Sequence, residues 1–170
     1  MLKWMGALLV VTATGAAGLG AIQTSAQRIR ILSGLIAALD LCQAELTFKL
    51  TALPDVMAQL ARKSAVAVRP FFSAVEKACA RLGEDSFGCL WQQCVQTMNA
   101  TWQRPELDIM EELGYVLGRY DTDGQSRAIA YARSRLEALR DRAESDHRQQ
   151  GRMYGALGLV SGLAVVILFI

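Results

Sequence analysis

The sequence predicts an all-α protein, an antiparallel helical bundle of about six helices flanked by N- and C-terminal transmembrane helices. Both ends of the chain are long, uncharged and apolar, and the apolar residues between them recur every three or four positions. No segment alternates polar and apolar residues as a half-buried strand would. We therefore divide the chain into an N-terminal transmembrane helix at 1–27, a cytoplasmic helical bundle at 28–152 and a C-terminal transmembrane helix at 153–170.

The first apolar run extends from Trp4 to Gln27 without a charged residue. A helix needs about 20 apolar residues to cross the hydrocarbon core of a bilayer. A cleaved signal peptide is the alternative, because Lys3 precedes the run and Thr24-Ser25-Ala26 resembles a cleavage site. The small residues Ala13, Ala17 and Ala21 form a stripe that is typical of a retained, packed helix, so we expect an uncleaved anchor.

The last apolar run extends from Met153 to Ile170 and is also uncharged. A buried core helix is the alternative to a membrane span, but such helices are usually shorter. Glycines at steps of four, three and four share one face of this helix, and small residues let another membrane helix approach closely. We therefore predict transmembrane helix packing at Gly151, Gly155, Gly158 and Gly162.

The arginines that flank the two apolar runs predict the orientation. Arg28 and Arg30 follow the first run, whereas Arg148 and Arg152 precede the second. Basic residues near membrane spans favour the cytoplasmic side. We expect a cell-membrane protein with two transmembrane helices whose bundle lies in the cytoplasm.

The bundle begins with an apolar seam at Leu32, Leu35, Leu39, Cys42 and Leu46. This first helix is predicted to end before Pro54, and a short second helix covers 55–65. Pro70 suits the first turn of a third helix, which carries its apolar face to Leu82 and ends at Gly83.

Three further helices complete the prediction. Ser86 is a candidate cap of the fourth, whose apolar face reaches Met98, and Pro105 opens the fifth. A turn is expected at 121–124. The sixth helix then runs from Gln125 to about Gln150, and its inward residues are Ile129, Ala132, Leu136, Leu139 and Ala143. We expect the first and last helices of the bundle to continue directly into the two membrane spans.

The chain lacks the motifs of common enzymes. Its four cysteines, Cys42, Cys79, Cys89 and Cys94, form no C-x-x-C pair, and His147 is the only histidine, which argues against a zinc site. It has neither a phosphate-binding loop nor a nucleophile elbow. We therefore predict a non-enzymatic protein with no catalytic residues, cofactor, metal or small-molecule substrate. A net charge of +2 does not favour nucleic acid as a partner.

One ordered stretch has the pattern Leu113-Gly114-x-x-Leu117-Gly118-x-x-Asp121-x-x-x-Gln125. Together with the opening Met-Leu-Lys-Trp-Met-Gly-Ala and the order of Leu39, Glu45, Leu46, Leu53 and Pro54, it resembles the stage III sporulation protein AB family. The resemblance covers essentially the whole chain. It implies a soluble domain similar to the F-type platform domain of type II secretion systems.

The resemblance also implies a function: a platform component of the mother cell–forespore channel, needed for endospore formation. Its partners would be a secretion-type cytoplasmic ATPase and other channel membrane proteins. Candidate partner contacts are Gly114, Gly118, Asp121 and Gln125, although the same four residues also suit a tight corner between two helices, with Asp121 capping the turn. A membrane-anchored adaptor or sensor that binds a regulatory protein is the alternative function.

Overall fold

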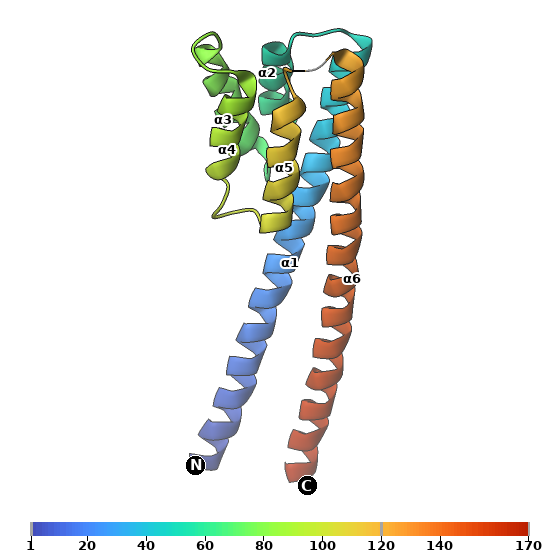
Figure 1. The fold of residues 1–170 in the computed structure, drawn as a ribbon. Helices are drawn as coiled ribbons and strands as arrows, with labels where there is room; N and C mark the ends of the chain where they lie inside the picture. Colours follow the sequence, from blue (N-terminus) through green and yellow to red (C-terminus); the bar gives the residue numbers. More distant parts are fainter. Residues whose placement is uncertain (1, 120, 170) are drawn as a thin grey trace. The chain divides into compact units, whose positions relative to one another are not determined.

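The structure is a computed structural model that describes residues 2–119 and 121–169, with side chains described for 24–119, 121–149, 151 and 153. The described residues form six α-helices and one short 3-10 helix, and no strand (Figure 1). The elements are α1 (Leu2–Phe48), α2 (Leu53–Lys63), α3 (Arg69–Ala78), η1 (Cys79–Arg81), α4 (Phe87–Gln96), α5 (Arg104–Val116) and α6 (Thr122–Phe169).

Two compact units divide the chain. One is Arg30–Arg140, and the other consists of Met1–Ile29 and Asp141–Ile170. The first unit lies inside the predicted bundle range of 28–152. Helices α1 and α6 are both unbroken, and each has one part in each unit. This continuity confirms that the first and last helices of the bundle extend into the apolar ends without a linker.

Within the unit Arg30–Arg140, the predicted apolar seam of α1 is confirmed, since its members are buried: Leu32, Leu35, Leu39, Cys42 and Leu46. The seam of α6 is buried at Ile129, Ala132 and Leu136. A salt bridge joins the two helices, with 2.5 Å between Arg133 Nη1 and Asp40 Oδ1. The Asp40 carboxylate raises the pKa of Arg133 above its ordinary value, first through this hydrogen bond and then through its charge.

The four shorter helices pack in sequence, with α2 on α3, α3 on α4 and α4 on α5 (Figure 1). Their largest buried side chains are aromatic. Phe71 meets Trp91 edge to face, with ring centroids 5.0 Å apart, and also contacts Phe72 and Trp102. Such ring pairs contribute about 0.5–1.5 kcal/mol beyond the area that they bury. Cys94 is buried beside this cluster on the apolar face of α4, as predicted.

The prediction that the first helix ends before Pro54 is confirmed, because α1 ends at Phe48. Other predicted boundaries were wrong: the second helix was expected at 55–65, but α2 covers Leu53–Lys63 and carries Pro54 in its first turn. The predicted turn at 121–124 is instead the start of α6, which begins at Thr122. The apolar face of α3 stops short of Leu82, which is 37% exposed, because the 3-10 turn at Cys79–Arg81 changes the direction of the chain.

Among the described residues, one helical segment, Thr24–Phe48, is long and apolar enough to cross a membrane. It lies near the N-terminus, which is consistent with association with a membrane. However, 56% of its apolar window is buried inside the protein, and its apolar seam from Leu32 to Leu46 is part of the core of the bundle. The predicted spans at 1–27 and 153–170 fall largely on residues whose side chains lie outside the described part, so the two transmembrane helices stay a prediction.

Candidate functional site

The candidate site is the corner where α5 ends and α6 begins. Helix α5 stops because Leu117 turns to extended backbone, while its N–H still donates to Leu113 O at 3.1 Å. Gly118 follows with φ +81°, in the left-handed region that favours glycine. A Cβ at Gly118 would also lie 3.2 Å from Phe87 Cβ. The backbone conformation therefore favours glycine at this position, and Phe87 leaves little room for a side chain.

Gly114 lies one turn earlier, buried where α4 and α5 cross. A Cβ on Gly114 would enter the Trp91 indole, reaching 3.0 Å from Cγ and from Nε1. The indole cannot easily move, because its Nε1 donates a buried hydrogen bond to Met110 O at 2.7 Å. On the facing helix, a Cβ on Gly88 would lie 2.9 Å from Gly114 O. Two glycines thus let the helices approach closely.

Asp121 caps the start of α6. Its Oδ1 accepts a hydrogen bond from Gly124 N at 3.1 Å, and its carbonyl accepts one from Gln125 N at 3.0 Å. A side-chain oxygen at this position satisfies a helical N–H group that has no partner within the helix. The predicted capping role of Asp121 is confirmed, and the side chain of Gln125 is half-buried in the same turn.

A second loop lies beside this corner. Ser126, in the second turn of α6, accepts a hydrogen bond from Gln43 Nε2 at 3.0 Å and contacts Thr47 Oγ1 at 3.5 Å. These contacts place the C-terminal end of α1, and hence the α1–α2 loop, next to the start of α6. The two loops together form one end of the unit Arg30–Arg140.

The last residue of α1 and the loop that follows it present two large apolar side chains to solvent. Phe48 is 85% exposed and Leu50 is 75% exposed. Leu50 also has φ +50°, a conformation that leucine rarely adopts. We name Phe48, Leu50, Gly118 and Asp121 the corner end. Phe48 and Leu50 were not predicted as site residues, because helical spacing continues the first helix toward Pro54.

A buried carboxylate holds the α1–α2 loop in this conformation. Glu45 is 2% exposed and accepts hydrogen bonds from Lys49 Nζ at 2.6 Å, Gln59 Nε2 at 3.1 Å and Thr51 Oγ1 at 3.2 Å. The bond from Lys49, with those from Gln59 and Thr51, lowers the pKa of Glu45 below its ordinary value against the opposing effect of burial. The carboxylate thus fastens both ends of the loop that carries Phe48 and Leu50.

The four predicted contact residues lie at or beneath the corner between α5 and α6. The structure brings three of the four predicted contact residues, Gly118, Asp121 and Gln125, to the corner itself. Gly114 is buried beneath the Trp91 indole, which is itself only 1% exposed. Contact with a partner stays a prediction for all four. Among residues with described side chains, no cluster of His, Cys, Asp or Glu could hold a metal ion.

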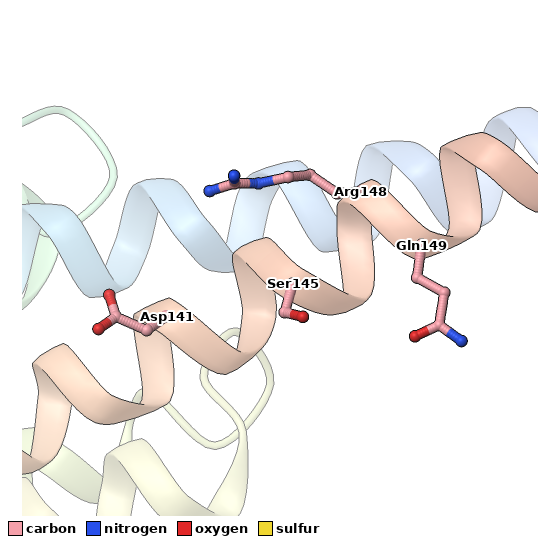
Figure 2. A pocket seen from close by; sticks show the side chains of 4 residues that line it. All are labelled: Asp141, Ser145, Arg148 and Gln149. Carbon is pink, nitrogen blue, oxygen red and sulfur yellow. The ribbon is translucent and has the colours of Figure 1, made fainter.

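Elsewhere, a shallow hollow on α6 is lined by Asp141, Ser145, Arg148 and Gln149. Figure 2 shows the side chains of Arg148 and Gln149 extending away from each other. Arg148 forms a salt bridge with Glu144, with 3.1 Å between Nη2 and Oε2. Nearby Gly151 is exposed, with no atom within 4 Å of where a Cβ would lie. The other predicted packing glycines, Gly155, Gly158 and Gly162, lie outside the residues with described side chains.

The fold and the corner define a class of protein. It is an all-helical protein in which the motif at 113–125 sets the packing of α4 on α5 and shapes the exposed corner end. Comparison with known proteins gives the particular family. The family described as stage III sporulation protein AB matches residues 3–170, so the chain belongs to that family. It is a sporulation family and not a known family of enzymes.

Two relatives support this assignment. Stage III sporulation protein AB of Bacillus subtilis (strain 168) is 29% identical over 170 residues, which cover 99% of each chain. A solved structure of stage III sporulation protein AB is also 29% identical and superposes with a TM-score of 0.66, covering 72% of this chain and 97% of the solved one. The helical fold is therefore shared with a structure in the same family.

We predict that Gly114→Ala destabilises the protein by about 1–3 kcal/mol, because the new methyl group overpacks the Trp91 contact. Gly151→Ala is the matched control, since its methyl group points into open space and alanine favours a helix. Thermal unfolding of the full chain in detergent, followed by near-ultraviolet circular dichroism, measures both. Equal midpoints for Gly114→Ala and the parent protein would contradict the packing role of Gly114.

We predict that Glu45 makes the stability of the protein depend on pH. Its pKa is lower in the folded than in the unfolded protein, so its stabilising effect is complete above the ordinary carboxyl pKa and is lost as pH falls through the folded-state value. Glu45→Gln should show a smaller drop in thermal midpoint between about pH 7 and about pH 3 than the parent protein. Parallel pH profiles for the two proteins would show that the carboxylate does not hold the loop.

Proposed function

We propose that this protein is a non-enzymatic membrane platform component of the channel between mother cell and forespore. It links a cytoplasmic ATPase to membrane ring proteins during endospore formation. The observation that carries the proposal is membership of the stage III sporulation protein AB family over residues 3–170. The hydrolysis of ATP belongs to the partner in this proposal, and this chain supplies the docking surface and the membrane anchor.

The arrangement of the chain supports an anchored platform. Two unbroken helices, α1 and α6, lead from the compact unit Arg30–Arg140 into the two uncharged apolar ends. We propose that these ends are transmembrane helices and that the bundle lies in the cytoplasm of the mother cell, because arginines flank the bundle side of both apolar runs. A cytoplasmic ATPase can then reach the bundle directly.

The corner end is the surface that we propose for the ATPase. Exposed Phe48 and Leu50 offer apolar anchors, and a few buried apolar anchors usually supply most of the binding energy of a protein interface. The Glu45 hydrogen bonds fix the loop before binding, which reduces the conformational entropy that the partner must overcome. Asp121 lies exposed beside this loop and can form polar contacts at its rim.

We predict that a compartment-dependent reporter inserted after the exposed Gly83 reads as cytoplasmic, and that one fused after Ile170 reads as extracytoplasmic. Gly83 suits the insertion because it lies in the exposed link before α4, outside the packed helices. The measurement is reporter activity in intact sporulating cells. A reporter at Gly83 that reads as extracytoplasmic would exclude a cytoplasmic ATPase as the partner of the bundle.

We predict that Phe48→Ser combined with Leu50→Ser lowers the recovery of a secretion-type ATPase with the full-length protein by about tenfold or more. The protein is purified from detergent-solubilised membranes of sporulating cells, and the ATPase is quantified by mass spectrometry. Tyr131→Ser is the control, since Tyr131 is 60% exposed but lies nine residues beyond the start of α6, outside the corner end. Undiminished recovery of the ATPase with the double variant would show that the corner end is not the docking surface. Recovery of a regulatory protein in place of any ATPase would favour the adaptor function.

A further inference from the structure

A second surface of the unit Arg30–Arg140 lies where α2 ends and α3 begins. Residues 62–69 read Arg-Lys-Ser-Ala-Val-Ala-Val-Arg, and we name them the basic loop. Arg62, Lys63 and Arg69 are exposed, and Val66 is 77% exposed at the middle of the loop. The loop therefore presents three cations around a protruding apolar side chain.

The three cations have neutral partners. Arg62 Nε donates to Ala58 O at 3.1 Å, and Lys63 Nζ donates to Gln59 Oε1 at 3.0 Å. Arg69 donates to Ser64 O from Nη2 at 3.0 Å and from Nε at 3.3 Å. In the part of the chain with described side chains, no carboxylate forms a salt bridge with any of them, unlike Arg81, Arg133 and Arg135. The positive charge of the loop is therefore not neutralised locally.

The basic loop packs against α1 close to the start of the unit. A Cβ on Gly34 would lie 3.1 Å from Val68 Cγ1 and 3.4 Å from Ala65 Cβ, so the absent side chain lets the loop lie directly on the helix. Gly34 follows Gln27, the last residue of the predicted membrane span, by seven residues, which is about 10 Å of helix.

That spacing matches the dimensions of a membrane surface. The polar headgroup layer adds about 5–8 Å on each side of the hydrocarbon core, and the electrostatic screening length at physiological salt is about 8 Å. Cations held within this distance of an anionic leaflet are attracted to its lipid phosphates. An exposed valine among them suits the boundary between headgroups and acyl chains.

We infer that the basic loop rests on the anionic headgroups of the membrane, with Arg62, Lys63 and Arg69 facing lipid phosphates and Val66 entering the interface. The inference rests on the proposed function, because it requires that α1 enter a membrane before Arg28. Charge complementarity favours a lipid surface as the occupant. The contact fixes the height of the bundle above the membrane and leaves the corner end free for a protein partner.

The experiment places an environment-sensitive fluorophore at Val66→Cys in the full-length protein, with Leu82→Cys as the reference position at the opposite end of α3. Both are made in a background of Cys89→Ser and Cys79→Ala, which removes the accessible thiols. The protein is reconstituted in nanodiscs of phosphatidylcholine alone, or mixed with phosphatidylglycerol, that contain a lipid with a spin-labelled headgroup. We expect quenching at position 66 to exceed that at 82, and only with phosphatidylglycerol present.

Two charge-reversal pairs make the test specific. Each cation near an anionic surface contributes about a fivefold preference for it, so Arg62→Glu with Lys63→Glu should lower quenching at 66 to the level at 82. Arg119→Glu with Arg127→Glu is the control, since it changes the net charge equally at exposed positions near the corner end. We expect that control pair to leave quenching at 66 unchanged.

The opposite results overturn the inference. Equal quenching at 66 and 82, or quenching at 66 that does not depend on phosphatidylglycerol, excludes an electrostatic contact with headgroups. If Arg62→Glu with Lys63→Glu keeps its quenching but loses the ATPase, the basic loop is a protein-binding surface. Because the reporters at Gly83 and Ile170 test the membrane topology separately, failure of the lipid contact is distinguishable from failure of the proposed function.

Discussion

The crossing of α4 and α5 is the contact on which the rest of the corner depends. Trp91 covers Gly114 and donates to Met110 O at 2.7 Å, so one side chain sets both the separation of the helices and their relative position along the axis. That position brings Phe87 over Gly118. The end of α5, the left-handed glycine and the start of α6 then follow within a few residues. Loss of the close approach would displace the whole turn.

The repeating apolar pattern was sufficient to predict the long helices. The seams of α1 and α6 are buried where three- and four-residue spacing placed them, except at Leu139, which is half-buried, because these helices contact the core along one face. The cap at Asp121 was also predictable, since it depends only on residues within the next helical turn. Local chemistry of this kind is fully contained in a short stretch of sequence.

The α1–α2 loop could not be predicted in the same way. Its conformation depends on hydrogen bonds from Lys49, Thr51 and Gln59 to one buried carboxylate, and Gln59 lies in another helix. Helical spacing alone continues the first helix toward Pro54. It therefore gives no sign that Phe48 and Leu50 are exposed. Likewise, the spacing of Gly114 and Gly118 indicated close packing, but only the fold shows that Trp91 and Phe87 are the residues packed there.

The conformation of Leu50 lowers the stability of the folded chain. A leucine with φ +50° carries a backbone strain of about 1–3 kcal/mol, and its side chain is largely in water, where it gains little from burial. Glycine would adopt the same backbone without strain. A leucine in this conformation therefore lowers the stability of the chain in exchange for an exposed apolar side chain, a trade that functional surfaces commonly make.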